Sequence, residues 1–214
     1  MTPRPPRPAT PPEIPPALRG AHFLMAAMQA RQLPAAEGGE IAFAGRSNAG
    51  KSTALNALTG VGGLARASKQ PGRTQALVVF ALAAGGWLVD LPGYGYAKVA
   101  QAERARWESM ITGYLTGRAG LRGLFLMMDA RHPMTPLDQQ MLHWCAGHPW
   151  AVHILLTKCD KLGRGAASAA LAGVRRALTG HPARASVQLF SGQTGQGLEE
   201  ARAVAARWLA APTG

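Results

Sequence analysis

Short apolar runs alternate with longer mixed stretches along most of the chain. The apolar runs predict strands at residues 41–44, 76–82, 87–90, 124–129, 152–157 and 187–190. The mixed stretches predict helices at residues 51–59, 101–116, 136–146, 166–178 and 198–209. Strands that are apolar throughout are typical of a parallel sheet with helices on both faces. The pattern therefore predicts an α/β fold with a mostly parallel six-stranded sheet.

One connection departs from this alternation. Gly85 and Gly86 separate the second and third predicted strands, as is typical of a hairpin. We therefore expect one antiparallel strand at the edge of the sheet. Residues 61–75 are polar and rich in glycine, and they predict a long loop.

The N-terminal segment differs in composition from the rest of the chain. Residues 1–17 hold eight of the 16 prolines. Proline fixes φ and lacks an amide donor, so we expect this segment to be extended or disordered and to lie outside the core. We interpret it as a solubilising tail, with a docking role as the alternative. Residues 18–212 are then a single domain.

The charge balance suggests an anionic partner. The chain carries 23 Lys and Arg against 11 Asp and Glu, which gives a formal charge of +12. Nucleic acid is the leading candidate for such a partner. The alternative is a basic tail together with an ordinary solvated surface.

Several classes of protein are excluded. The longest apolar stretch, residues 76–89, is interrupted by two glycines and is too short to span a membrane. Residues 1–17 contain no apolar core of a signal peptide. Cys145 and Cys159 are too few for a disulfide framework or a zinc site. We therefore expect a cytoplasmic protein without membrane contact.

A phosphate-binding loop is the clearest motif. Residues 45–52, Gly-Arg-Ser-Asn-Ala-Gly-Lys-Ser, follow a predicted strand and begin a predicted helix, which is the context that this motif requires. Glycines let backbone amides surround phosphate oxygens at a helix N-terminus. Lys51 would reach the β- and γ-phosphates, and the Ser52 hydroxyl would bind Mg²⁺. The loop alone does not separate ATP from GTP.

Two further elements point to the terminal phosphate. Asp90-Leu91-Pro92-Gly93 ends a predicted strand, where ligands bind in sheets of this kind. Asp90 would hold Mg²⁺ through a water, and the Gly93 amide would approach the γ-phosphate. Thr74 would offer its hydroxyl to Mg²⁺ and its amide to the γ-phosphate, so its loop would become ordered with the triphosphate.

The base would be read by Thr157-Lys158-Cys159-Asp160, which follows a predicted strand. A carboxylate such as that of Asp160 accepts hydrogen bonds from both N1–H and the exocyclic amine of guanine, and adenine offers no such pair. The stem of Lys158 would lie over the base. Ser191-Gly192 would place a backbone amide at the guanine O6. The ligand is therefore expected to be a guanine nucleotide.

These motifs carry a closer resemblance. GRSNAGKST, QPGRTQ, DLPGYGYAKV, DARHPMTPLDQQML and LLTKCDKL, between about residues 41 and 162, resemble the EngB (YihA/YsxC) family of bacterial ribosome-assembly GTPases. That family belongs to the TrmE-Era-EngA-EngB-Septin-like superfamily. The resemblance implies a cytoplasmic, mostly monomeric Ras-like G domain. It also implies a role in maturation of the large ribosomal subunit, through its RNA, and in normal cell division and septation.

The resemblance also implies a set of site residues. Mg²⁺ would be held by Ser52 and Thr74. The implied contacts to GTP and GDP are Gly45, Arg46, Ser47, Asn48, Ala49, Gly50, Lys51, Ser52, Gly72, Arg73, Thr74, Gln75, Ala76, Asp90, Leu91, Pro92, Gly93, Thr157, Lys158, Cys159, Asp160, Phe190, Ser191 and Gly192. The family usually has a second serine at position 192, so we expect a looser loop there.

Lys51 and Thr74 would assist phosphoryl transfer, but the group that orients the attacking water has several candidates. Ras-like enzymes carry a water-orienting Gln directly after D-x-x-G, where this chain has Tyr94, so we predict slow turnover. Asn48 lies where potassium-activated relatives hold a monovalent cation such as K⁺, although it could satisfy local backbone groups alone. The ribosome could instead supply a group. Arg73 is a weaker candidate and fits an RNA phosphate better.

Two functions remain open. The chain could be a GTP-hydrolysing assembly factor whose loops respond to the nucleotide. It could also be an RNA-binding module that uses GTP or GDP as a sensing ligand with negligible catalysis. An ATPase or nucleotide kinase lacks support, because the TKCD element specifies guanine.

Overall fold

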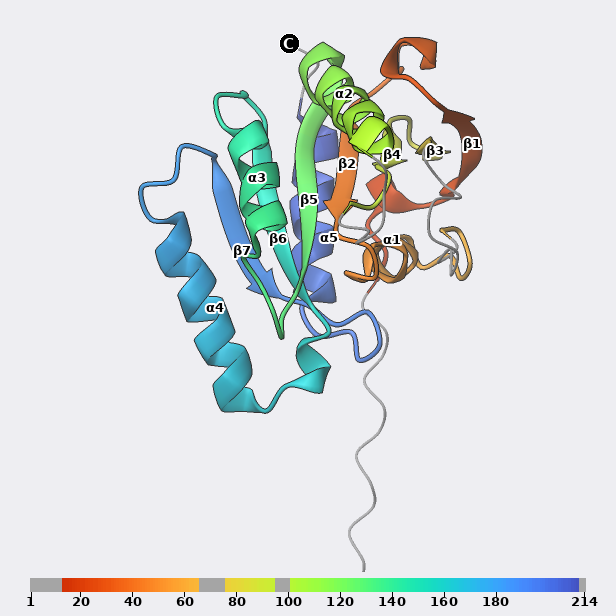
Figure 1. Cartoon of the computed structure of the whole chain (residues 1–214). Coiled ribbons are helices and arrows are strands. Elements are labelled where there is room, and N and C mark those ends of the chain that lie inside the picture. The colour runs from red at the N-terminus through yellow and green to blue at the C-terminus, as the bar shows by residue number, and fades with distance from the viewer. Residues whose placement is uncertain (1–12, 66–75, 95–100, 212–214) are drawn as a thin grey trace, which may run out of the picture.

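The computed structural model describes residues 13–65, 76–94 and 101–211, with the backbone alone for residues 101–104 (Figure 1). The strands are β1 (His22–Ala27), β2 (Glu40–Gly45), β3 (Leu77–Ala81), β4 (Trp87–Asp90), β5 (Leu121–Asp129), β6 (Ala151–Thr157) and β7 (Ala185–Leu189). The helices are α1 (Lys51–Thr59), α2 (Gln101–Gly117), α3 (Pro136–Cys145), α4 (Arg164–Leu178) and α5 (Leu198–Ala210), with 3₁₀ turns η1 (Pro16–Leu18), η2 (Ala30–Gln32) and η3 (Cys159–Lys161). None of the helices in these residues is long and apolar enough to cross a membrane.

The strands form one mixed sheet in the order β1-β3-β4-β2-β5-β6-β7. Strands β4, β2, β5, β6 and β7 are parallel, and β3 runs antiparallel to both of its neighbours. The predicted α/β fold with a mostly parallel sheet is confirmed. The predicted number of six strands is wrong, because the described residues contribute seven. The antiparallel strand β3 therefore lies second from the edge, and β1 covers it.

The strand that was not predicted, β1, has no periodic pattern of apolar residues in the sequence. Phe23 and Leu24 are neighbours, and both are exposed, at 59% and 42%. The pairing with β3 also shifts register between Phe23 and Met25. A strand without alternation or continuous burial cannot be separated from a loop by its hydrophobic pattern. Its pairing with β3 defines it instead.

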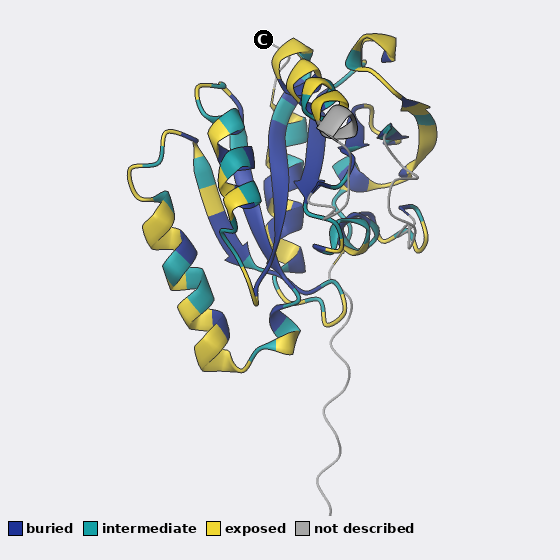
Figure 2. Cartoon of the chain, viewed as in Figure 1, coloured by how far each residue is buried: buried dark blue, intermediate teal, exposed yellow. Residues whose placement is uncertain are grey.

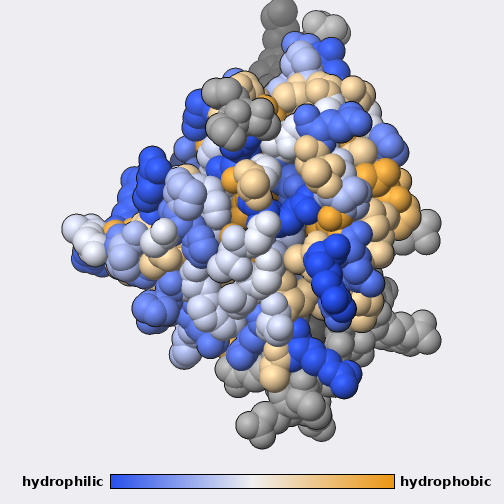
Figure 3. Space-filling view, turned by 90° about the horizontal axis from the view of Figure 1, so that it is seen from above, coloured by the Kyte–Doolittle hydropathy of each residue, from blue (hydrophilic) through white to orange (hydrophobic). Residues whose placement is uncertain are grey.

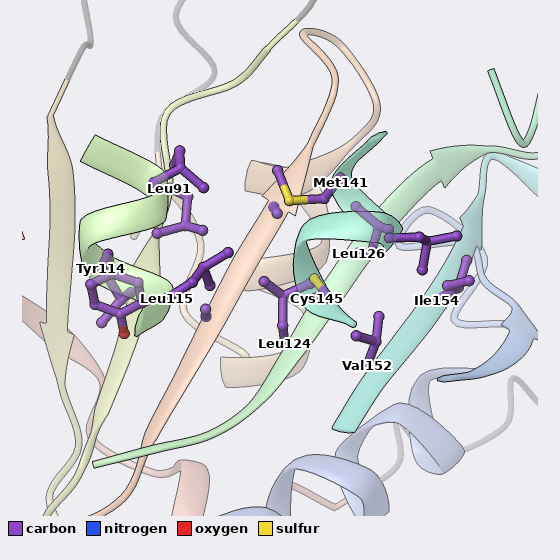
Figure 4. Packing of buried hydrophobic residues seen from close by; sticks show 14 of the residues in the cluster. Leu91, Tyr114, Leu115, Leu124, Leu126, Met141, Cys145, Val152 and Ile154 are labelled. Carbon is purple, nitrogen blue, oxygen red and sulfur yellow. The ribbon is translucent and has the colours of Figure 1, made fainter. Parts of the chain in front are cut away.

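Alternate residues of the central strands enter two cores. On β2, Ala42 and Ala44 belong to the core under α2, α3 and α4, whereas Ile41 and Phe43 belong to the core under α1 and α5. Figure 2 shows the buried sheet between these two layers of helices. Figure 4 shows part of the first core, where Tyr114 and other side chains from α2 and α3 meet those of β5 and β6.

A buried ion pair joins α2 to the beginning of β2. The carboxylate of Glu40 accepts hydrogen bonds from the Tyr114 hydroxyl at 2.8 Å and from the Arg118 guanidinium. Arg118 also donates to the carbonyls of Leu33 at 3.2 Å and Pro34 at 2.8 Å. Burial, together with the Glu40 carboxylate, raises the pKa of Tyr114 well above its usual value. The network therefore fixes three segments at the end of the sheet remote from the strands' carboxyl ends.

A buried arginine holds the N-terminal segment against the domain. Arg202 of α5 donates to the carbonyls of Ala57 at 2.9 Å and Leu58 at 3.0 Å, near the end of α1, and to that of Glu13 at 3.3 Å. Carbonyls in the last turn of a helix lack partners within the helix, and a cation suits them. Leu18 is 1% exposed and enters the same core. The described residues before β1 therefore pack against α1 and α5.

Both cysteines are free and buried. Cys145 lies in the core under α3, and burial raises the pKa of its thiol to about 12. Burial also raises the pKa of Cys159, with a smaller contribution from the Asp160 carboxylate. The Cys159 thiol donates to the Gln196 side chain at 3.3 Å. Both thiols therefore serve packing and local hydrogen bonding.

Candidate functional site

The carboxyl ends of β2, β4, β5, β6 and β7 meet at one edge of the sheet, because these strands are parallel. Ligands of open α/β sheets bind outside this edge. The edge carries the connection from β2 to α1 at residues 45–52, and residues 90–94 after β4. It also carries residues 157–160 after β6 and residues 190–192 after β7. The fold thus gathers four of the predicted segments.

The backbone between β2 and α1 is curled tightly. Asn48 has φ of 62° and Gly50 has φ of 91°, and Gly50 is the N-cap of α1. A Cβ on Gly45 would lie 2.9 Å from the carbonyl oxygen of Met127, so the close approach to β5 requires glycine there. Asn tolerates the left-handed conformation better than other non-glycine residues. The described contacts give the exposed Asn48 side chain no hydrogen-bond partner.

Two oppositely charged side chains of the site are paired with each other. The Lys51 ammonium, at the first residue of α1, forms an ion pair with the carboxylate of Asp90, the last residue of β4. Their side chains are 14% and 15% exposed. Burial raises the pKa of Asp90, and the Lys51 charge offsets only part of that rise. The pair therefore places a cation and a carboxylate directly beside the curled loop.

The segment after β4 runs alongside the same loop. The Ser47 amide donates to the Tyr94 carbonyl at 2.8 Å, and the Tyr94 amide donates to the Gly45 carbonyl at 3.4 Å. The side chain of Tyr94 is 4% exposed, and its ring lies 5.5 Å from that of Trp107. Its hydroxyl donates to Asp138 at 3.3 Å. Tyr94 is therefore engaged by α2 and α3.

Asp138 of α3 joins three parts of the site. Its side chain is fully buried, and it accepts hydrogen bonds from Arg46 at 3.2 Å and from the Tyr94 hydroxyl. The other carboxylate oxygen accepts from the Thr135 amide and hydroxyl, which caps α3. Arg46 also donates to the His132 carbonyl at 2.9 Å. The curled loop, the segment after β4 and the beginning of α3 therefore share one carboxylate.

The segment after β6 is bonded to the curled loop. The Thr157 hydroxyl donates to the Ala49 carbonyl at 2.6 Å, and the Lys158 ammonium donates to the Asn48 carbonyl at 2.6 Å. Lys158 also pairs with Asp129 at 3.0 Å. Hydrogen bonds from Arg131 hold the pKa of Asp129 well below its usual range, so this carboxylate stays charged. Lys158 is thus anchored from both sides.

Asp160 is held by the segment after β7. The Ser191 hydroxyl donates to Asp160 Oδ1 at 2.6 Å, and Lys161 lies 3.4 Å from Oδ2. The Ser191 hydrogen bond is the main reason that the pKa of Asp160 is lowered. The Ser191 oxygen in turn accepts from the amides of Gln193 and Thr194. The carboxylate is therefore ionised and fixed in orientation.

The turn at Gly192 lies close to α1. A Cβ on Gly192 would lie 2.8 Å from the Thr53 methyl group and 3.2 Å from its carbonyl, so a serine would have to displace α1 or Thr53. Further on, Gln188 donates to the Gly197 carbonyl through Nε2 at 2.7 Å, and its Oε1 accepts a hydrogen bond from Nε2 of the buried His153 ring at 2.7 Å. These contacts fasten both ends of the turn.

The remaining predicted residues divide into three groups. Leu91, Cys159 and Phe190 are buried and support their loops by packing, and the Pro92 carbonyl accepts from the Trp107 indole at 2.9 Å. Ser52 and Gly93 are partly exposed at the edge formed by the carboxyl ends of the parallel strands. Ala76 is partly exposed directly before β3. Gly72, Arg73, Thr74 and Gln75 lie outside the described residues.

Two carboxylates of the site have no assigned role in the sequence analysis. Asp129 and Asp138 each contact a predicted site residue, Lys158 and Arg46 respectively. Asp129 is the last residue of a strand whose carboxyl end reaches this edge, and that position was an available signal. Asp138 is 92 residues from Arg46 in sequence, so only the folded chain brings the two together.

Comparison with known proteins adds a second kind of support. A family model described as "50S ribosome-binding GTPase" matches residues 40–158. The chain is 52% identical over 195 residues to the probable GTP-binding protein EngB of Azoarcus sp. strain BH72, covering 91% of this chain and 93% of the relative. It is 47% identical over 196 residues to the protein of the same name from Coxiella burnetii strain RSA 331, covering 92% and 96%.

Solved structures share the fold. The crystal structure of a probable GTP-binding protein engB superimposes with a TM-score of 0.64 at 19% identity, covering 79% of this chain and 98% of that one. A structure of Era, in complex with MgGDPNP and nucleotides 1506–1542 of 16S ribosomal RNA, gives a TM-score of 0.63 at 23% identity. It covers 81% of this chain and 57% of that one.

Proposed function

Because the chain belongs to the EngB family of GTP-binding proteins, within the GTPases, we propose that it hydrolyses GTP to GDP and phosphate as a nucleotide-switched assembly factor for the large ribosomal subunit. In this role it would be needed for normal cell division and septation. The observation that carries the proposal is the convergence of Lys51, Asp90, Lys158 and Asp160 at one edge of the sheet.

Guanine recognition rests on Asp160. An ionised carboxylate accepts two hydrogen bonds from guanine, one from N1–H and one from the exocyclic amine, and charge-assisted bonds of this kind are strong. The Ser191 hydroxyl occupies one side of the carboxylate at 2.6 Å and lowers its pKa. Lys158, anchored on Asp129 and on the Asn48 carbonyl, would place its stem against the base.

Phosphate binding rests on the curled loop and Lys51. The first amides of α1 lack partners within the helix and form an anion site at its N-terminus. Lys51 is already bound to Asp90, so binding of a phosphate would exchange one anionic partner for another. The exchange would leave the Asp90 carboxylate free to turn towards a metal-bound water.

The donors at this edge fit Mg²⁺. Magnesium prefers a few protein oxygens and completes its shell with phosphate oxygens and waters. Ser52 and Asp90 supply such oxygens, and the described residues contain no cluster of three or more His, Cys, Asp or Glu that would suit another metal. Ser52 and Thr74 would bind the ion directly and Asp90 through a water. When bound, the ion supplies charge neutralisation at the phosphates.

We propose that intrinsic hydrolysis is slow. Tyr94 stands at the position of the water-orienting Gln, its hydroxyl is bonded to Asp138, and its side chain is buried. A buried phenol of raised pKa cannot orient an attacking water as an exposed amide does. This observation also favours the second candidate, an RNA-binding module with negligible catalysis.

Monovalent cations provide one way to accelerate the reaction. Asn48 has an exposed side chain that the described contacts leave without a hydrogen-bond partner, so it is available to coordinate K⁺. We expect hydrolysis to be about tenfold faster or more in K⁺ than in Na⁺, as expected for one added charge-stabilising contact. Asn48→Ala should remove the difference. Equal rates in the two salts for the unmodified protein would contradict this role of Asn48.

Ribosomal particles provide the decisive test of the function. We expect large-subunit precursors to sediment with the protein more strongly with a non-hydrolysable GTP analogue than with GDP, and to stimulate phosphate release. Small-subunit particles serve as the control. Nucleotide-dependent binding without stimulation would favour the sensing module. Equally strong binding to the particles with the GTP analogue and with GDP would rule out the proposed switch.

A further inference from the structure

Positive charge is concentrated without any acidic residue in one part of the fold. Residues 161–198, from the last residue of η3 through α4 and β7, contain Lys161, Arg164, Arg175, Arg176 and Arg184 and neither Asp nor Glu. Residues 41–89 also lack Asp and Glu, but they include the phosphate-binding loop and the segment 66–75 that lies outside the described residues. A segment such as 161–198 attracts polyanions over a distance comparable with the Debye length, about 8 Å at physiological salt.

The helix arranges two of these arginines on one line. Arg164 and Arg175 are separated by 11 residues, close to three turns of an α-helix, so they project from the same face about 16 Å apart. Ser168 and Ala172 are exposed between them. Because these side chains are small, a sugar–phosphate backbone could approach the helix closely along this line.

The other two arginines lie near the C-terminal end of α4, beside the edge strand β7, and Arg176 projects about 100° around the helix from Arg175. Arg176 follows Arg175 in the last turn of α4, and Arg184 lies six residues beyond the end of that helix, directly before β7. Arg184 donates one hydrogen bond to the Pro149 carbonyl at 2.9 Å, which fixes the guanidinium. We call Arg164, Arg175, Arg176 and Arg184 the α4 stripe.

The α4 stripe is not neutralised by the protein itself. All four residues are exposed, and none of the ion pairs among the described residues includes any of them. Several other arginines are instead committed to carboxylates: Arg46 to Asp138, Arg118 to Glu40 and Arg131 to Asp129.

The surroundings of α4 leave it accessible. Figure 1 places α4 at one lateral edge of the molecule, and Figure 2 shows that its outer side is exposed. Figure 3 views the molecule from the end remote from the nucleotide edge. On that face hydrophobic residues gather on the side of β1, and mostly hydrophilic ones lie on the side of α4. The lateral edge formed by α4 and β7 is thus suited to a charged partner.

We infer that the α4 stripe is the RNA-binding surface of the protein and that it contacts the phosphate backbone of large-subunit ribosomal RNA. The inference rests on the proposed function, and it adds the surface and the mode of binding. Exposed guanidinium groups form paired hydrogen bonds with phosphate oxygens, and recognition through the backbone tolerates many sequences. Arg164 begins α4 close to the nucleotide edge, whereas Arg175, Arg176 and Arg184 lie at the other end of the helix, so nucleotide and RNA could be bound together.

The test compares two double variants of equal charge. Arg175→Gln/Arg176→Gln removes two charges from the α4 stripe. Arg31→Gln/Arg106→Gln removes two exposed charges from the groove of about 830 Å³ between η2 and α2, towards the lateral edge of the sheet that is opposite β7. The melting temperatures of both variants are first measured, to confirm that they equal that of the unmodified protein. Affinity for protein-free large-subunit ribosomal RNA is then measured across a salt series.

The α4 variant is expected to bind this RNA about tenfold more weakly. Its slope of log affinity against log salt should be smaller by about 1.5, since each lost phosphate contact removes about 0.7–0.9. The control variant should behave as the unmodified protein. Equal loss in both variants would show diffuse attraction, and loss in the control alone would assign the RNA to the groove. Either result overturns the inference.

Two further outcomes separate this inference from the function. If the unmodified protein does not bind the free RNA, the α4 stripe is not its RNA-binding surface, although stimulation of hydrolysis by intact particles would still support the proposed function. If the α4 variant loses binding to intact particles while neither it nor the unmodified protein binds free RNA, the surface faces an acidic protein. The assignment to RNA is then wrong.

Discussion

Replacing Asp160 with asparagine should reverse the base preference of the protein. The carboxylate is positioned to accept two charge-assisted hydrogen bonds from guanine, each worth about 1.5–3 kcal/mol. Losing both corresponds to roughly 10²- to 10⁴-fold weaker binding of GDP and GTP. Xanthine carries a carbonyl oxygen where guanine carries the exocyclic amine, so the asparagine amide could donate to it. Affinity for XDP should therefore rise while that for GDP falls.

The variant should keep the surrounding loop intact. Ser191 donates to Asp160 Oδ1, and the amide oxygen of asparagine can accept the same bond. Titration of GDP, XDP and ADP measures the preference directly. Glu199→Gln is a suitable control, because it removes one exposed carboxylate from the first turn of α5 without touching the nucleotide edge. Unchanged preference for GDP in Asp160→Asn would disprove the base-reading role.

Arg118→Ala should cause the largest loss of stability among the substitutions considered. Glu40 is fully buried, and removing its partner leaves an unpaired carboxylate in the core. Breaking a buried ion pair in this way costs about 3–5 kcal/mol. For a domain of this size the melting temperature should fall by roughly 10–15 °C. Thermal denaturation followed by circular dichroism measures the change.

Two comparisons separate charge from packing. Arg106→Ala, at an exposed position of α2, the helix that ends directly before Arg118, should change stability by at most about 0.5 kcal/mol. Glu40→Gln/Arg118→Met removes both charges and should recover much of the loss, because no unpaired charge is then left in the core. A double variant as unstable as Arg118→Ala would show that packing, and not the unpaired charge, sets the cost.

The sequence predicted the parts of the fold that have a strong local signal. An apolar run followed by a glycine-rich turn predicted β2 and the loop before α1. That prediction was possible because phosphate binding by such a loop is local and needs residues at fixed spacing. The described strands and helices that follow β1 were each placed within a few residues. The edge strand β1 was missed because its exposed Phe23 and Leu24 follow neither strand pattern.

The supporting shell of the site could not be predicted in the same way. Asp138 reaches Arg46 and Tyr94 only because α3 packs beside the edge, and no spacing in the sequence encodes that contact. The same holds for Gly192, whose close approach to Thr53 depends on how β7 and α1 are placed. Local motifs identify a ligand class, whereas long-range packing decides how firmly each ligand-facing group is held.

The burial of both thiols has a practical consequence. Alkylating reagents attack the thiolate, and groups that are shielded and hard to ionise react slowly. Cys145 and Cys159 are 1% and 3% exposed, and the chain has no other cysteine. A cysteine introduced on the surface would therefore be the fast-reacting position, and a fluorescent dye could be attached there without first removing the native sulfur atoms.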